Sequence, residues 1–169
     1  MVLTPGTKLG PYEIVAPLGA GDGKPFALVQ TNCNEEQAQF SPDGKWIAYQ
    51  SNETGRFEIY VQPFSGLEGK SLISPSGGGQ VRWRRDGREL FYVALDGRLM
   101  AIPVQPASSG HAVDAGAPVP RFATPMSGAP DERQQYVVSS DGQRFMMKTV
   151  TEPAGTSPIT LILNWKPRS

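Results

Sequence analysis

The sequence contains few of the residues that bind metals or act as nucleophilic catalysts. Its 169 residues include a single cysteine, Cys33, and a single histidine, His111. One cysteine forms no intramolecular disulfide and no cysteine-rich metal site. No serine lies in a G-x-S-x-G segment, which argues against a Ser-His-Asp triad. We therefore expect no catalytic residue, no bound metal and no cofactor.

Net charge is also lacking, and so is any long apolar run. The 16 lysines and arginines balance 16 aspartates and glutamates, so no net field attracts nucleic acid or an anionic membrane. No run of about 18 apolar residues occurs, and the N-terminus lacks the basic and apolar regions of a signal peptide. We expect a soluble, cytoplasmic chain that binds neither nucleic acid nor membrane.

An internal repeat is the main feature that is present. Three segments each place an Asp-Gly pair between two apolar runs: Ala38–Ser51, Val81–Ala94 and Tyr136–Thr149. The pairs are Asp43-Gly44, Asp86-Gly87 and Asp141-Gly142. The second interval between pairs is the longer one and contains the low-complexity stretch Pro106–Pro120. Repeats of roughly 40 to 50 residues are typical of propeller blades.

The residues around each Asp-Gly pair predict a hairpin turn. In the first copy, Pro42 presets φ for the turn, Asp43 suits the next position, and Gly44 accepts the left-handed conformation that returns the chain. An aspartate in such a turn could instead be a catalytic acid or a metal ligand. Because the pair recurs at equivalent places, we assign all three aspartates a structural role.

Strands are predicted on both sides of these turns, and the 19 glycines and 16 prolines disfavour long helices. Phe57–Gln62 alternates as a half-buried strand should. Outer strands are expected at Lys70–Ser74 and Arg121–Thr124, and Lys24–Thr31 resembles the outer strand of an incomplete blade. The last run, Ile159–Trp165, should pair with Phe145–Val150. The fold class is therefore all-β.

The densest basic cluster surrounds Trp83 and consists of Arg82, Arg84, Arg85 and Arg88. In a strand, Trp83 would pack in the sheet while its neighbours face the other way. We expect these arginines to be the candidate binding patch for an anionic partner.

The segment Leu9–Gly21 resembles the first strand and the start of the glycine-rich loop of bacterial serine/threonine protein kinases. Gly19 and Gly21 match the first two glycines of G-x-G-x-x-G-x-V, while Lys24 stands at the third. The later kinase motifs that hold magnesium and transfer phosphate are absent. The two glycines are therefore a weak remnant of a nucleotide-binding loop, and we expect no kinase activity.

From Lys24 onward, the sequence is similar to the TolB-like propeller half of many such kinases. The resemblance rests on the three Asp-Gly segments and on SPITLILNW near the C-terminus. It implies a truncated kinase segment at 1–23 and, at 24–169, a partial β-propeller of about three antiparallel four-stranded blades. In that family the propeller is a sensing or protein-binding module, often placed outside the membrane.

The resulting expectation is a non-catalytic module that binds a protein or a small ligand. Closed propellers have about four to eight blades, so open blade edges could also promote self-association. The alternatives are a degenerate serine/threonine kinase, the propeller cap of a serine peptidase, and a structural remnant without a ligand.

Overall fold

The computed structural model describes residues 8–9, 12–13, 32–64, 69–110, 112–126, 134–148 and 159–162. The chain divides into two compact units, Met1–Gln30 and Thr31–Ser169. In the first unit, β1 (Lys8–Leu9) pairs antiparallel with β2 (Tyr12–Glu13). The expected boundary after residue 23 and the expected outer strand at 24–31 fall outside the described residues and stay predictions.

The described residues of the second unit form three antiparallel sheets, which we call the first, second and third blades. The first blade contains β3 (Glu35–Phe40), β4 (Trp46–Ser51), β5 (Glu58–Pro63) and β6 (Ser71–Leu72). The second contains β7 (Gly79–Trp83), β8 (Glu89–Val93), β9 (Arg98–Pro106), β10 (Val113–Ala115) and β11 (Val119–Ala123). The third contains β12 (Tyr136–Val138), β13 (Phe145–Lys148) and β14 (Ile159–Ile162).

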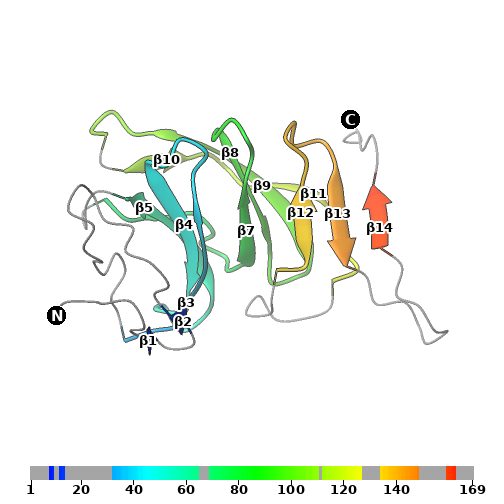
Figure 1. Cartoon of the computed structure of the whole chain (residues 1–169), viewed down its shortest axis with the longest axis horizontal. Coiled ribbons are helices and arrows are strands. Elements are labelled where there is room, and N and C mark those ends of the chain that lie inside the picture. Colours follow the sequence, from blue (N-terminus) through cyan, green and yellow to red (C-terminus); the bar gives the residue numbers. More distant parts are fainter. Residues whose placement is uncertain are drawn as a thin grey trace. The chain divides into compact units, whose positions relative to one another are not determined.

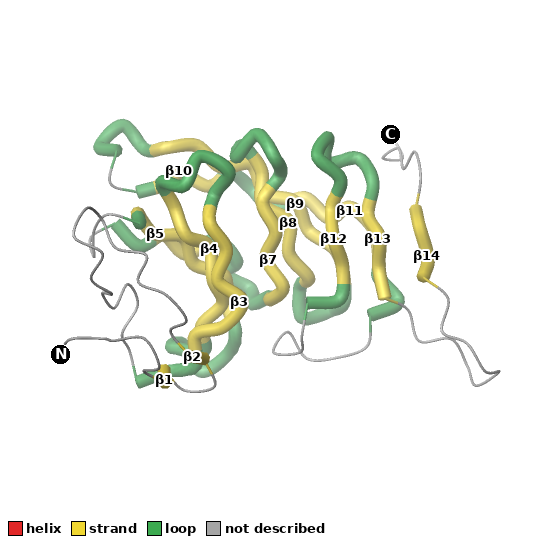
Figure 2. Tube along the Cα trace, viewed as in Figure 1, coloured by secondary structure: helices red, strands yellow, loops and turns green. Residues whose placement is uncertain are grey.

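The blades stand side by side in chain order (Figure 1). In the part of the chain that the structure describes, every regular element is a strand (Figure 2). No helix of that part is long and apolar enough to cross a membrane. The predicted all-β class and the predicted arrangement as blades of a partial propeller are confirmed.

The outer strand of the second blade is divided into two pieces. The long strand β9 pairs with β10 near its C-terminal end, where Val113 lies opposite Pro106, and with β11 near its start, where Val119 lies opposite Ala101. The low-complexity stretch Pro106–Pro120 therefore supplies the last residue of β9, all of β10 and the first two residues of β11. The strand expected at Arg121–Thr124 is β11, which begins at Val119.

Strand β5 differs from its expected half-buried pattern. All six of its residues are buried, including Glu58 and Gln62. The polar side chains that made the sequence alternate are buried and hydrogen-bonded. For example, Tyr49 Oη donates to Gln62 Oε1 at 3.1 Å. A buried polar side chain is tolerated when it is hydrogen-bonded, which is why alternation alone did not reveal the burial.

Two apolar clusters join the blades, and the second blade contributes to both. Successive strand residues point to opposite faces of a sheet. In β8, Leu90 and Tyr92 accordingly lie in the cluster shared with the first blade, whereas Phe91 and Val93 lie in the cluster shared with the third. The second blade is therefore buried on both faces.

Glutamine side chains also join β7 to the first and third blades. Gln80 sits at a bulge in β7 with a φ of 60°, and its backbone N–H donates to Gln50 Oε1 of the first blade at 2.9 Å. Its own Oε1 accepts from the backbone N–H of Gln135 at 2.8 Å. Since a buried amide needs a hydrogen-bond partner, these bonds hold the bulged strand β7 between the first and third blades.

Adjacent residues of β13 test the packing between the second and third blades. Phe145 is 1% exposed and contacts the rings of Phe91 and Phe122, whereas Met146, on the opposite face, is 42% exposed. Phe145→Ala should lower the free energy of unfolding by about 3–5 kcal/mol, because a buried ring is replaced by a cavity. Met146→Ala should lower it by less than about 1 kcal/mol. Urea unfolding of both variants measures this, and equal losses would contradict the assigned faces.

Candidate functional site

The three Asp-Gly pairs lie in the turns that join the first two strands of each blade. Gly44, Gly87 and Gly142 have φ values of 71°, 72° and 72°, the left-handed conformation that glycine adopts without strain. In each turn the glycine N–H donates to the carbonyl two residues before the aspartate, at 2.9 Å. The same turn is thus built three times.

The aspartate side chains are engaged within their own turns. Asp43 Oδ1 accepts from the Ser41 hydroxyl at 2.6 Å and from the Lys45 backbone N–H at 3.1 Å. Asp141 is held in the same way by Ser139 and by the Gln143 N–H. These bonds lower the pKa of both carboxyls, the serine hydroxyl having the largest effect. In this arrangement the carboxylates stabilise turns.

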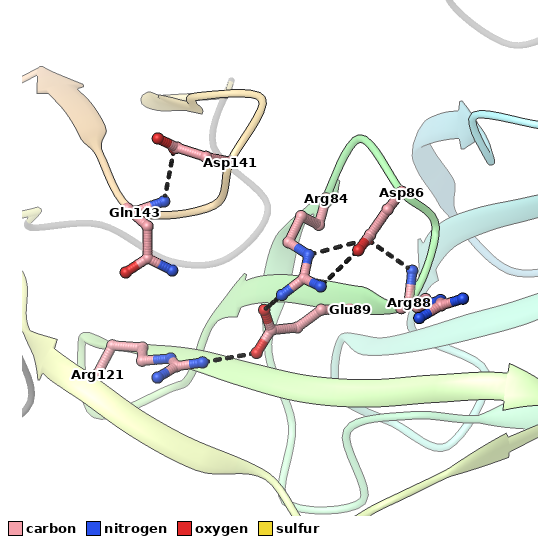
Figure 3. Close-up of polar contacts among 7 residues, drawn as sticks. All are labelled: Arg84, Asp86, Arg88, Glu89, Arg121, Asp141 and Gln143. Atoms are coloured by element: carbon pink, nitrogen blue, oxygen red, sulfur yellow. Dashed lines mark hydrogen bonds and ion pairs between the residues drawn. The ribbon is translucent and has the colours of Figure 1, made fainter.

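The second turn carries Arg84 where the other two carry serine. Arg84 Nε donates to Asp86 Oδ1 at 2.9 Å, and its Nη1 donates to Glu89 Oε2 at 3.0 Å. Arg121 reaches the other oxygen of Glu89 from β11 at 2.6 Å (Figure 3). The hydrogen bond from Arg84 is the main reason that the pKa of Asp86 falls to about 2.

Neighbouring turns lie close together at one end of the blades. A methyl group added at Gly87 would lie 3.6 Å from Pro42 of the first turn, and one added at Gly142 would lie 2.7 Å from Arg84 of the second. Because the turns are this close, side chains from different repeats line a common surface.

A groove of about 810 Å³ opens between the turns of the first and second blades. Its lining includes Trp46 and Trp83, which are 7% and 9% exposed. The remaining lining comes from both turns, the end of β9 and the start of β10: Ser41, Pro42, Asp43, Arg85, Asp86, Gly87, Arg88, Pro103, Val104, Gln105, Pro106 and Val113. This volume falls in the range of about 300–1,000 Å³ found for ligand sites.

The structure separates the four arginines of the expected patch. Arg82 is half-buried and its Nε donates to the Tyr136 carbonyl of the third blade at 3.4 Å. Arg84 is held by its two carboxylates. Arg85 and Arg88 are exposed and line the groove. In Figure 3 the Arg88 side chain points away from Glu89. Only two of the four arginines are thus brought together at a possible binding site.

A second polar cluster lies at the start of β5. Glu58 is 2% exposed and accepts hydrogen bonds from the Thr54 hydroxyl, the Tyr60 hydroxyl and Arg56 Nε. Burial raises the pKa of this carboxyl, but the three hydrogen bonds together outweigh burial and lower it. A carboxylate held by three donors stabilises the hairpin, and we assign it no chemistry.

Other residues considered from the sequence are outside the described part. This applies to Gly19 and Gly21 of the glycine-rich segment and to His111. Among the residues that the structure does describe, no group of three or more His, Cys, Asp or Glu side chains could hold a metal ion.

No protein-family model matches the chain, and no curated protein matches it. Among solved structures, it is similar to oligogalacturonate lyase from Vibrio parahaemolyticus, with a TM-score of 0.51 and 16% identity over 71% of this chain. It is also similar to TolB from Acinetobacter baumannii, with a TM-score of 0.46 and 17% identity over 70% of this chain. The chain spans 31% of the lyase and 27% of TolB. The likeness to the lyase, a β-propeller protein, shows the fold alone.

The pKa of Asp86 tests the hydrogen bonds around the second turn. Because the folded-state pKa is about 2, below the ordinary 3.8, the stability contributed by this group is present above pH 4 and is lost as the pH falls toward 2. Arg84→Ala should raise the pKa of Asp86 by at least about one pH unit and leave that of Asp43 unchanged. Carboxyl ¹³C NMR titration of both groups measures the effect. An unchanged Asp86 midpoint would show that Arg84 does not hold this carboxylate.

Proposed function

We propose that this chain is a binding module whose ligand occupies the groove between the first and second blades. The observation that carries the proposal is that one concave surface is lined by Trp46 from the first repeat and by Trp83, Arg85 and Arg88 from the second. Ligand sites are typically concave and largely apolar, with a few polar groups that fix orientation.

The polar groups of the groove are suited to recognition. Arg85 and Arg88 have no carboxylate within ion-pair distance among the described residues, and their guanidinium groups can donate several hydrogen bonds each. Tryptophan and arginine are also the side chains that most often dominate binding energy at interfaces. By contrast, Asp43 and Asp86 are already bonded within their turns, so we assign them a supporting role and no acid–base chemistry.

We also propose that the module derives from the propeller half of a bacterial serine/threonine kinase and acts in sensing. This part rests on the sequence resemblance of Leu9–Gly21 and of the three Asp-Gly segments. The competing function is phosphoryl transfer by a degenerate kinase, for which ATP binding and Mg²⁺-dependent turnover by the purified chain are the discriminating measurements. Measurable turnover would replace the binding-module proposal.

NMR spectroscopy of the tryptophan side chains tests where ligands bind. The chain has three tryptophans, and single Trp→Phe variants assign their indole N–H signals. In a screen of small-molecule fragments and short peptides, binders should shift the Trp46 signal. The reason is that Trp46 lines the groove.

A matched pair of substitutions controls this screen. Gln105 is exposed and lines the groove, and Gln143 is exposed in the turn of the third blade. Gln105→Phe should fill the groove and abolish the shifts, whereas Gln143→Phe should preserve them. Binders that shift signals only outside the groove, or that are insensitive to Gln105→Phe, would refute the proposed location.

A further inference from the structure

The seam where β7 of the second blade meets β12 of the third contains a cation without an anionic partner. Arg82 is half-buried on β7, and its Nε donates to the Tyr136 carbonyl of β12 at 3.4 Å. Burial lowers the pKa of Arg82, and the Tyr136 phenol is the one described group whose charge interacts with it. A cation partly removed from water, with no counter-charge among the described residues, favours an anion beside it.

The carboxylates of the neighbouring turns are already paired with other arginines. These pairs are Arg84 with Asp86 and Glu89, Arg121 with Glu89, and Arg144 with Asp141. Positive and negative groups balance within the pairs of the second blade. The charge of Arg82 is therefore the one that a ligand in the seam would neutralise.

The Tyr136 hydroxyl adds a buried donor to the same seam. Tyr136 packs in one apolar cluster with Phe91, and Phe91 lies directly opposite Arg82 in the register of β7 and β8. Tyr136 is 2% exposed, and its Oη has no hydrogen-bond partner among the described residues. Burial raises the pKa of Tyr136, while the charge of Arg82 lowers it. The hydroxyl is therefore protonated and lies near enough to Arg82 for the two groups to interact.

Gln134 adds one acceptor to these donors. Its Nε2 donates at 3.1 Å to the carbonyl of Gln80, which stands two residues before Arg82 on β7. Its Oε1 is buried and has no hydrogen-bond partner in the described part of the chain. A buried polar atom without a hydrogen bond costs free energy, so both Gln134 Oε1 and Tyr136 Oη favour a polar partner. The seam thus offers a guanidinium and a phenol as donors and one amide oxygen as acceptor.

We propose that this seam binds a small carboxylate that also carries a hydroxyl group. The carboxylate would accept hydrogen bonds from Tyr136 Oη and from the Nη groups of Arg82, since a guanidinium binds a carboxylate through paired N–H donors. The hydroxyl of the ligand would donate to Gln134 Oε1. An ammonium group in that position is disfavoured, because Arg82 already makes the seam positive.

This site is separate from the groove of the proposed function. The groove lies on the face of the second blade that packs against the first blade, whereas the seam lies on the face that packs against the third. Each site can therefore be tested without the other.

The experiment uses glycolate as the probe and follows the side-chain amide NMR signals of Gln134 in the full chain. Glycolate should shift these signals saturably. Acetate, which lacks the hydroxyl group, should bind at least about threefold more weakly, because one hydrogen bond is lost. Glycine should also bind more weakly than glycolate, because its ammonium group is repelled by Arg82.

Two conservative variants test the donors. Tyr136→Phe keeps the buried ring and removes a hydrogen bond to a charged group, so the affinity for glycolate should fall at least about tenfold. Arg82→Lys keeps the charge and removes the paired donors, and it should also lower the affinity at least about tenfold. Tyr92→Phe is the matched control and should retain the affinity, because Tyr92 is equally buried, at 3% exposure, but packs in the cluster shared with the first blade.

Each other outcome would overturn the inference. Shifts that grow with glycolate concentration without saturating would show an adventitious ion only. Acetate or glycine binding as tightly as glycolate would remove the predicted role of the hydroxyl group. Unchanged affinity in folded Tyr136→Phe or folded Arg82→Lys would remove that residue from the site. None of these results affects the groove, because the fragment screen at Trp46 can be repeated in the Arg82→Lys variant.

Discussion

Packing of one sheet face against the next is the interaction on which the rest of this structure depends. The strands are short, and an isolated sheet of three or four short strands has no core of its own. Here the alternating side chains of β8 enter two clusters, one on each side of the second blade. The second blade is therefore the structural centre of the second unit, and the first and third blades each bury a face against it.

The groove is a consequence of this packing combined with the repeated turn. Stacked blades place equivalent turns next to each other, so that Pro42 of the first turn comes close to Gly87 of the second. Arg84 makes the second turn differ from the others, because it takes the place of a turn serine and binds Asp86 and Glu89. This leaves Arg85 and Arg88 without an ion pair in the described residues, and both line the groove. Local turn chemistry and long-range packing thus combine to form one candidate site.

Much of the fold could be predicted from the sequence because the turn signals are local. Asp43-Gly44 and its two repeats identified the hairpins, and the apolar runs after them identified β4, β8 and β13. The burial of β5 could not be read in this way, because Glu58 and Gln62 look solvent-exposed until their hydrogen-bond partners are known. The division of the outer strand into β10 and β11 depends on the length of β9 and not on a local signal.

The candidate site was only partly predictable, for a similar reason. The arginines around Trp83 stand together in the sequence, but strand alternation and the following turn direct them to different places. Arg82 contacts the third blade, whereas Arg85 and Arg88 line a groove shared with the first. The other components, such as Trp46 and Gln105, belong to segments that meet only after the blades stack. A single sequence does not reveal such contacts, since they join residues tens of positions apart.

Hydrogen–deuterium exchange of the whole chain tests the packing of the blades most directly. Amides that open only on global unfolding exchange last, and those in elements with fewer buried contacts exchange earlier. Packing on both faces of the second blade predicts that the backbone amides of β8 and β9 are the slowest to exchange, slower than those of β12 and β13. Faster exchange in β8 and β9 than in β12 and β13 would contradict the assignment of the second blade as the centre of the fold.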